Sequence, residues 1–348
     1  MHTISVNVSQ PYHVHIGAGL LAHSGDLIAR TLSARRCALV SDSNTAPLYA
    51  KTVANALQAA GVTVFPYTLP AGEQHKTLPN CAELLSFFAK SGLTRTDFAV
   101  ALGGGVVGDM TGFACAIYQR GIDFVQMPTT LLAACDASVG GKTAVDLPEG
   151  KNLAGAFHQP RLVLCDSDTF QTLPSSVFAD GMAEVIKHAL IADCTLLTAL
   201  ENDLPPMDEL VQRNVAIKAG IVCEDEQEHG KRKLLNFGHT LGHAVEVCSN
   251  YSISHGKAVA IGMALVCRAA ERMGYSPPGT LHTVCSLLRR FSLPSECPFT
   301  AEALYSAATA DKKRSGDGID IVILKEPGCA DTLRLTLPQL RTFTEAAL

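Results

Sequence analysis

The stretch FAVALGGGVVGD, residues Phe98–Asp109, joins a short apolar run to a glycine-rich loop. The apolar run Phe98–Leu102 has the length and composition of a buried strand. The loop Gly103–Asp109 contains the pattern G-x-G-x-x-G, whose glycines let backbone N–H groups approach a pyrophosphate at a helix N-terminus. The loop follows a later strand than the usual dinucleotide fingerprint does, and no acidic residue stands at the usual distance for a ribose. The pattern favours nucleotide binding over a purely structural glycine turn.

Strands and helices alternate on both sides of this loop. Period-two alternation predicts an opening hairpin, and short apolar runs separated by helical segments predict further strands. The predicted strands are Ile4–Val8, Tyr12–Ile16, Cys37–Val40, Val62–Tyr67, Phe124–Met127 and Leu162–Cys165, and the predicted helices are Pro47–Ala60 and Leu78–Ser91. Such strand–helix–strand units are typical of a parallel sheet, which binds ligands at the carboxyl ends of its strands.

The periodicity becomes mainly helical after Leu173-Pro174. We expect helices over residues 176–192, 207–224, 238–249, 256–273, 279–290 and 336–347, interrupted by a small hairpin from Ile321–Leu324 and Leu333–Leu335. The sequence therefore predicts an α/β domain over residues 1–174 and a mainly helical domain over residues 175–348.

The composition excludes several classes of protein. The chain has 348 residues, of which 47% are hydrophobic and 18% charged, as expected for a folded globular protein. A formal net charge of −5 without a basic tail makes nucleic acid and anionic membrane poor partners. We find no apolar run of spanning length, no signal peptide and no C-x-x-C pair among the twelve scattered cysteines. These features predict a cytoplasmic protein with reduced cysteines.

Two histidines four residues apart, His239 and His243, would share one face of a helix. His255 follows them, and upstream Glu184 and Lys187 lie one helical turn apart. Neutral imidazoles with one carboxylate and an open position are the donors of a catalytic divalent-metal site, most often zinc. These histidines are equally compatible with ordinary hydrogen-bonded residues of a helical core, because an H-x-x-x-H pair without the glutamate of H-E-x-x-H is a weak signal. Both interpretations stay open at this point.

The segment Gly140–Thr143 ends in Gly-Lys-Thr and resembles the end of a P-loop. The earlier glycine is missing at the required spacing, which excludes an NTPase of that kind. Lys142 and Lys151 lie among small residues and suit an anionic ligand, although a solvated loop is a strong alternative for Lys151.

Two charged clusters precede the histidines. Glu224–Glu226 with Glu228 is interpreted as a solvated helix end. Lys231–Lys233 is either similarly exposed, or brings cationic groups to a phosphorylated or carboxylated substrate.

Several motifs occur in order along the chain and together resemble the 3-dehydroquinate synthase family of sugar phosphate cyclases. They are Gly103–Asp109, Pro128–Leu132, Asp136–Thr143, Ala183–Lys187, Leu235–Thr240 and Asp311–Lys313. The resemblance extends over nearly the whole chain, and motifs of five or more residues make it specific.

The resemblance implies a Rossmann-like NAD-binding α/β domain, a helical metal-binding domain, and a carbon–oxygen lyase of the shikimate pathway, which leads to chorismate and the aromatic amino acids. The implied reaction converts 3-deoxy-D-arabino-heptulosonate 7-phosphate to 3-dehydroquinate and phosphate, with catalytic NAD and a divalent metal, zinc or cobalt. The resemblance also implies a homodimer, because Arg120 matches a residue that reaches the substrate phosphate from the neighbouring subunit.

The resemblance further assigns residues to each ligand. The implied metal ligands are Glu184, His239 and His255. The implied substrate contacts, besides Arg120, are Asp136, Lys142, Asn152, Lys187, Lys218, Arg232, Asn236, His243 and Lys312. The implied NAD contacts are Asp42, Asn44, Glu73, Lys76, Gly105, Val106, Val107, Gly108, Asp109, Thr129, Thr130, Lys142, Lys151, Thr169 and Leu173. His243 matches a residue assigned to proton handling, and His75 replaces a more typical residue near the adenine side of NAD.

Three alternatives compete with this interpretation. A metal-dependent polyol dehydrogenase of the same fold would release NADH, but a neutral alcohol needs no set of lysines. A cyclase for another sugar phosphate would lack a residue matching Asn236 or His243, and both are present. A non-catalytic nucleotide-binding protein would have lost a metal ligand or a pocket lysine, and none is missing.

Overall fold

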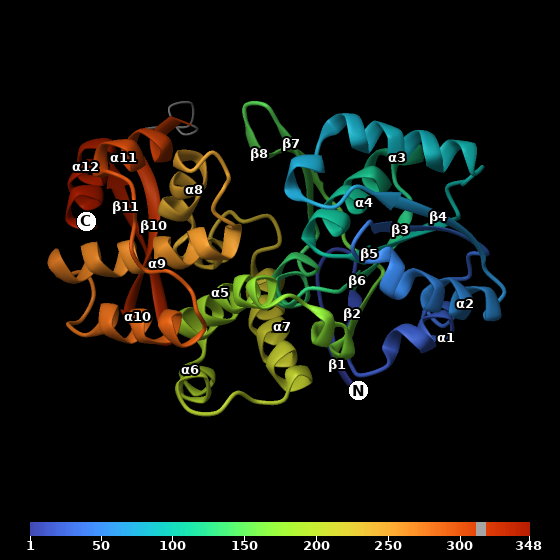
Figure 1. Ribbon diagram of the computed structural model, residues 1–348, viewed down its shortest axis with the longest axis horizontal. Coiled ribbons are helices and arrows are strands. Elements are labelled where there is room, and N and C mark those ends of the chain that lie inside the picture. The colour runs from blue at the N-terminus through green and yellow to red at the C-terminus, as the bar shows by residue number, and fades with distance from the viewer. Residues whose placement is uncertain (311–317) are drawn as a thin grey trace. The chain divides into compact units, whose positions relative to one another are not determined.

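A computed structural model describes residues 1–310 and 318–348, so the expected substrate contact Lys312 lies outside the described residues. The chain divides into two compact units (Figure 1). The first comprises Met1–Pro174 and Pro206–Gln227, and the second comprises Ser175–Pro205 and Glu228–Leu348.

A seven-stranded sheet forms the centre of the first unit, in the order β1-β2-β9-β6-β5-β3-β4. Its strands are β1 (His2–Val6), β2 (Tyr12–Gly17), β3 (Arg36–Asp42), β4 (Thr63–Leu69), β5 (Phe98–Gly103), β6 (Asp123–Pro128) and β9 (Leu162–Asp166). β1 and β2 pair antiparallel, and all other neighbours pair parallel. The predicted hairpin and parallel sheet are confirmed.

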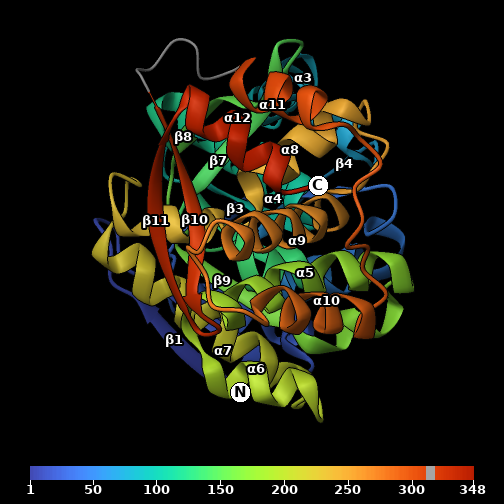
Figure 2. The ribbon, with the colours of Figure 1, turned by 90° about the vertical axis from the view of Figure 1, so that its left-hand side faces the viewer.

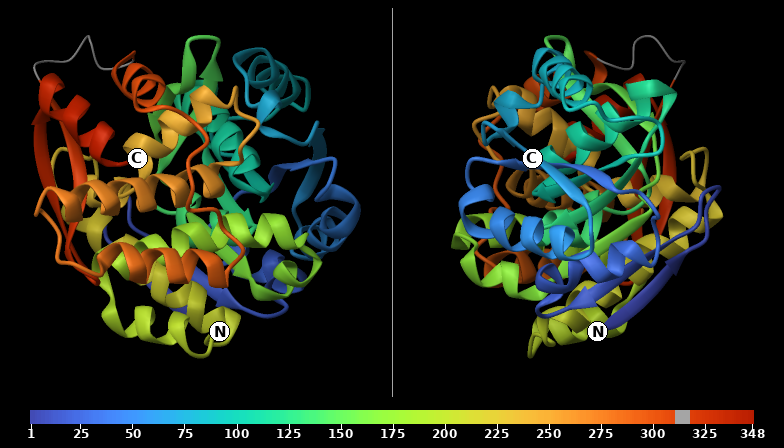
Figure 3. Two further views of the ribbon diagram at one scale, coloured as in Figure 1. Left: turned by 60° about the vertical axis from the view of Figure 1, so that its left-hand side comes forward. Right: turned by 90° about the vertical axis from the view of Figure 1, so that its right-hand side faces the viewer.

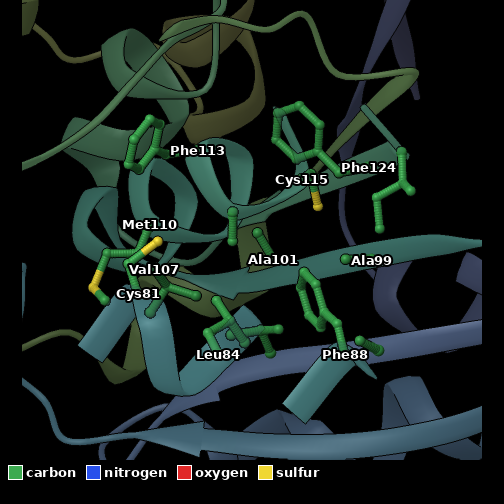
Figure 4. Close-up of a cluster of buried hydrophobic side chains, with 14 of the residues drawn as sticks. Cys81, Leu84, Phe88, Ala99, Ala101, Val107, Met110, Phe113, Cys115 and Phe124 are labelled. Carbon is green, nitrogen blue, oxygen red and sulfur yellow. The ribbon is translucent and has the colours of Figure 1, made fainter. Parts of the chain in front are cut away.

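Helices cover both faces of this sheet, because alternate residues of its strands point to opposite sides. On β3, Cys37 and Leu39 join a cluster with α1 (Ser24–Ala29) and α2 (Lys51–Ala59). On the other face, β5 meets α3 (Leu78–Lys90) and α4 (Gly105–Ile117), as Figures 1 and 3 show. Figure 4 shows the residues of this second cluster, with Leu84 and Phe88 beside Ala99 and Ala101.

A second hairpin follows the sheet strand β6, formed by β7 (Lys142–Leu147) and β8 (Gly150–Phe157). The sequence predicted only a loop rich in small residues here. Gly155 explains the pairing, because a Cβ at this position would lie 2.3 Å from the backbone oxygen of Thr143. Gly155 permits the close backbone approach at which the two strands pair antiparallel.

The helix α7 (Met207–Glu224) departs from the expected division at residue 175, because it groups with the first unit. It packs against β1, β2 and the turn Ala133–Ala137. Its buried face includes Leu210, Val215 and Val222. Beyond its end, Glu226 accepts hydrogen bonds from the backbone and hydroxyl of Ser9, each 2.8 Å long. Glu226 therefore fixes a loop and is not the solvated residue that the sequence suggested.

Helices dominate the second unit, together with the hairpin β10–β11. They are α5 (Ser175–Ala192), α6 (Cys194–Glu201), α8 (His239–Cys248), α9 (His255–Arg272), α10 (Thr280–Arg290), α11 (Ala301–Ala310) and α12 (Leu337–Ala346), and the strands are β10 (Gly318–Glu326) and β11 (Cys329–Thr336). The hairpin packs against α5, α9 and α12 (Figure 2). The predicted helices and hairpin are confirmed, whereas α6 and α11 were not predicted.

Glycines on α9 bring α5, α8 and α9 close together. A Cβ added at Gly262 would lie 2.0 Å from the backbone oxygen of Gly238, just before α8. A Cβ at Gly256 would lie 2.3 Å from the backbone oxygen of Asp180 on α5. The three helices therefore approach at distances that no residue larger than glycine permits at these positions.

Among the described residues, no helix is long and apolar enough to span a membrane.

Candidate active site

Three residues of the second unit, Glu184, His239 and His255, place their donor atoms within 4.8 Å of one another. Glu184 lies on α5, and the two histidines are the first residues of α8 and α9. Glu184 Oε1 lies 3.5 Å from His239 Nε2 and 3.6 Å from His255 Nε2. Glu184 is fully buried, whereas 13% of the His239 side chain and 34% of the His255 side chain are exposed.

This donor set fits a divalent metal ion. Ligands held tetrahedrally at about 2.0–2.1 Å from zinc lie roughly 3.4 Å apart, close to the two separations from Glu184 Oε1. The outer nitrogen of each imidazole also has an acceptor: His239 Nδ1 lies 3.1 Å from the carbonyl oxygen of Phe237, and His255 Nδ1 lies 3.4 Å from Glu246 Oε1. An N–H donated at Nδ1 leaves the Nε2 lone pair for a metal.

The two histidines differ in their electrostatic surroundings. Burial, followed by the positive charge of Lys187, lowers the pKa of His239 to about 3. Burial alone would lower the pKa of His255 too, but hydrogen bonds to Glu184 and Glu246 and the charges of both carboxylates raise it to about 10. The two carboxylates thus favour a positive charge between them, as a cation site requires.

Three further expected site residues belong to the second unit, two of them on α5 and α8 and one on a separate short helix. Lys187, whose side chain is 1% exposed, forms an ion pair with Glu184. His243 follows His239 by one turn of α8, with ring centroids 5.5 Å apart. Arg232 is 1% exposed within the short helix Lys231–Asn236. These positions bring two cations and a third imidazole into the same unit as Glu184, His239 and His255.

Asn236 ends the same short helix and donates a 2.6 Å hydrogen bond from Nδ2 to Glu228 Oε1. Glu228 has a positive φ of 63°, which a non-glycine residue rarely adopts. The sequence analysis interpreted Glu228 as part of a solvated acidic cluster, whereas the structure shows it partly buried and hydrogen-bonded to Asn236. Asn236 is itself an expected substrate contact, so Glu228 holds a site residue in place.

Three expected ligand contacts converge in the first unit around Lys76, which is 4% exposed. Its Nζ donates to Asp109 Oδ2 and to Asn152 Oδ1, both at 2.6 Å. Burial opposes the charge on Lys76, but Asp109 and Glu73 raise its pKa above the usual value. Glu73 also lies 3.8 Å from the Nζ of Lys151. Lys151 is therefore not simply solvated.

A second buried cation of this unit lies on α7. Lys218 is 6% exposed, and its Nζ lies 2.9 Å from Asp136 Oδ1. The pair joins α7 to the turn Ala133–Ala137. Both residues are expected substrate contacts, and their pairing explains why α7 groups with the first unit.

The glycine loop has both structural and ligand-binding features. A Cβ at Gly108 would lie 2.7 Å from Gln126 Oε1, so this glycine is required for packing. Gly104 caps α4 without a side-chain hydrogen bond, and a Cβ at Gly105 would meet only Ala137 Cβ, at 3.6 Å. The first turn of α4 therefore presents backbone N–H groups beside small residues, as an anion site does.

The remaining expected contacts of the first unit lie at strand ends, in loops and at the start of α4. Asp42 Oδ1 accepts from the backbone N–H groups of Asn44 and Thr45, at 2.9 and 2.8 Å. Thr169 is 1% exposed and donates to the carbonyl of Asp166 at 2.7 Å. Thr129 and Thr130 follow β6, and Val106 and Val107 lie at the start of α4. Lys142 is the first residue of β7, and Leu173 lies near the end of the unit's first segment. Arg120 is exposed and has a φ of 68°.

Comparison with known proteins identifies the family to which the chain belongs. The family model for the N-terminal part of 3-dehydroquinate synthase matches residues 66–180, and the model for the C-terminal part matches residues 181–314. The chain belongs to the 3-dehydroquinate synthase family. A 3-dehydroquinate synthase from Caulobacter vibrioides is 43% identical over 95% of this chain and 94% of its own length.

Two solved structures of sugar phosphate cyclases are similar to the whole chain. One is a 2-deoxy-scyllo-inosose synthase in complex with carbaglucose-6-phosphate, NAD+ and Co2+, with a TM-score of 0.88, 25% identity and coverage of 99% of both chains. The other is ValA, a 2-epi-5-epi-valiolone synthase from Streptomyces hygroscopicus with NAD+ and Zn2+ bound. Its TM-score is 0.88 at 28% identity, and 97% of this chain and 96% of that chain are covered. The family assignment confirms the resemblance seen in the sequence.

Proposed function

We propose that this chain converts 3-deoxy-D-arabino-heptulosonate 7-phosphate to 3-dehydroquinate and phosphate. The observation that carries the proposal is the 43% identity to a 3-dehydroquinate synthase over nearly the full length of both chains. The second support is the donor cluster of Glu184, His239 and His255. The enzyme is then a carbon–oxygen lyase of the shikimate pathway.

Glu184, His239 and His255 would hold the metal, which when bound supplies Lewis-acid polarisation of substrate hydroxyl groups. We propose zinc or cobalt as the native ion, because two imidazoles and one carboxylate suit either. The ion pair with buried Lys187 fixes the carboxylate of Glu184 between the two histidines. Lys187 thereby also places an ammonium group where the substrate binds.

The substrate carries a carboxylate and a phosphate, which explains the many cations of the expected site. Lys142, Lys187, Lys218 and Arg232 would bind these groups, with Lys312 as a further cation outside the described residues. Asp136, Asn152 and Asn236 would orient the hydroxyl groups. His243 would move a proton during ring opening and closure.

NAD would bind in the first unit, with its pyrophosphate at the start of α4 beside Gly105 and Gly108. It supplies reversible hydride transfer at C5 of the substrate and is therefore regenerated in each turnover. A ketone at C5 would acidify the neighbouring C–H bond, so that phosphate could leave by elimination, with its own oxygens taking the proton. Protein side chains mainly position the reacting groups.

We further propose a homodimer in the cytoplasm. Arg120 would reach the phosphate of the neighbouring subunit, and its exposed position on a strained turn is compatible with this role. All twelve cysteines lie within the described residues and form no disulfide bonds there, as expected in a reducing compartment.

One experiment separates the cyclase from a dehydrogenase. Purified protein is mixed with Zn2+ or Co2+, substoichiometric NAD and the seven-carbon sugar phosphate, and phosphate and NADH are followed together. Phosphate in large excess over NAD, without lasting NADH, is the expected result. NADH that accumulates in step with turnover would make the protein a dehydrogenase. If neither phosphate nor NADH is formed, the proposed substrate is overturned.

A further inference from the structure

We propose that Glu246 is a positioning residue for the metal ligand His255, so that metal affinity depends on a second carboxylate that does not itself bind the ion. The inference rests on the metal site of the proposed function. Neither the sequence motifs nor the family resemblance assigned a role to Glu246.

The burial of Glu246 demands an explanation. Only 1% of the residue is exposed, and its helix α8 buries Leu241, Ala244 and Val245 around it. A buried carboxylate is costly unless a partner offsets the loss of its hydration. One partner of this carboxylate is the imidazole of His255, whose Nδ1 lies 3.4 Å from Glu246 Oε1.

His255 therefore lies between two carboxylates. Its Nε2 faces Glu184 Oε1 at 3.6 Å, and its Nδ1 faces Glu246 at 3.4 Å. A proton held at Nδ1 by Glu246 fixes the tautomer and the ring orientation that present Nε2 to a metal. The negative charge of Glu246 also makes the imidazole a stronger donor.

His239 provides an internal comparison. Its Nδ1 lies 3.1 Å from the neutral carbonyl oxygen of Phe237, which fixes the same tautomer without a charge. The side chain of His239 is also less exposed than that of His255, 13% against 34%. His255 has more contact with water and less support from packing, so it depends more on its charged partner.

Glu246 also belongs to a second group of possible ligands, with His243 and His255. Because His255 is common to both groups, direct binding of the metal by Glu246 is the competing explanation. The exposed His243 makes the second group the weaker site, since the first contains the fully buried Glu184 and the mostly buried His239.

The test measures metal affinity and not only activity. Protein stripped of metal is titrated with Zn2+ against a chromophoric chelator for the wild type, Glu246→Gln, Glu246→Ala and Glu246→Asp. We expect about tenfold weaker binding for Glu246→Gln, which keeps an acceptor but loses the charge, and up to about 100-fold for Glu246→Ala. Glu246→Asp should recover part of the affinity.

Glu271→Gln is the matched control. Glu271 lies on α9 like His255 but accepts a hydrogen bond from the backbone of Leu281 at the other end of the helix, roughly 24 Å away at 1.5 Å per residue. It should leave metal affinity unchanged. Thermal unfolding of each metal-free variant separates a loss of affinity from a loss of fold.

Two results would overturn the proposal. Unchanged Zn2+ affinity in Glu246→Ala would give the carboxylate a purely structural role. Loss of Zn2+ binding in Glu246→Ala and Glu246→Gln as complete as in His255→Ala, with the fold kept, would make Glu246 a ligand. If the wild type itself binds no divalent metal, the metal site of the proposed function fails first, which distinguishes the two failures.

Discussion

The three-residue donor group of Glu184, His239 and His255, called the metal cluster here, and the glycine loop would bind their ligands by opposite means. The cluster consists of three side chains from three helices, whose spacing depends on close helix packing at Gly256 and Gly262. The loop offers backbone N–H groups at the start of α4, where the glycines leave them accessible. Substitutions should therefore affect the first site through donor chemistry and helix spacing, and the second through steric access.

The largest effect is expected for His255→Ala. Removing one of three ligands should abolish bound metal and reduce turnover to background, while the fold is kept, because 34% of this side chain is exposed. Metal content per chain, activity and circular dichroism check the three parts of this prediction. Full activity in the variant would remove His255 from the ligand set.

Gly262→Ala tests helix spacing without touching any ligand. The added Cβ would lie 2.0 Å from the Gly238 oxygen and 2.7 Å from the Gly242 nitrogen, so α8 must move away from α9. We expect the free energy of unfolding, measured in urea, to fall by about 1–3 kcal/mol. Zn2+ should also bind more weakly, because His239 moves with α8.

Gly220→Ala is the matched control for this substitution. Gly220 lies inside α7 with nothing within 4 Å of an added Cβ. Its replacement should stabilise the protein by roughly 0.5–1 kcal/mol, since alanine is the better helix former. Equal effects of the two substitutions would show that helix spacing does not determine the metal cluster.

The sequence predicted most of the fold because its signals are local. The short apolar runs Cys37–Val40 and Phe98–Leu102 identified strands of a parallel sheet, and long apolar periodicity identified α9. The hairpin β7–β8 was missed because its strands pair through the small residues around Gly155. Short helices such as α6 give too few turns for a periodic pattern.

The candidate site was less accessible to local reasoning. Spacing alone suggested His239 and His243 as a metal pair, and only the family resemblance selected His255 and Glu184. The structure brings these three together through tertiary contacts that no sequence period encodes. The partners Glu228 and Glu246 were missed for the same reason, since each meets its site residue only after the helices have packed.

Arg120→Ala tests whether the first unit also contributes to a neighbouring subunit. Loss of a charged hydrogen bond to phosphate, worth about 1.5–3 kcal/mol, should raise the KM for the sugar phosphate roughly 10- to 100-fold and leave NAD binding unchanged. Steady-state kinetics with each ligand varied in turn measures both. Equal losses for substrate and NAD would indicate a folding or dimer defect instead.

A mixing experiment sharpens this prediction. Arg120→Ala subunits, expected to bind the sugar phosphate weakly, and His255→Ala subunits, expected to bind no metal, are unfolded together, refolded and assayed at a substrate concentration far below the KM of Arg120→Ala. If Arg120 acts across a dimer, mixed dimers contain one complete site, and random assembly should restore about a quarter of wild-type activity. Activity no greater than the sum of the separate variants would place Arg120 in its own subunit's site.

Gly105→Ala should have the smallest effect, and it isolates the steric argument for the loop. The new Cβ would make only an ordinary contact of 3.6 Å with Ala137, so stability and metal content should stay at wild-type values. The same methyl group lies at the first turn of α4, where it would hold a pyrophosphate away from the backbone N–H groups. We expect NAD to bind about tenfold more weakly, a change of about 1.4 kcal/mol, in a direct titration. Unchanged NAD affinity would remove the backbone at Gly105 from the NAD site, and the loop and the metal cluster would then not differ in the way proposed.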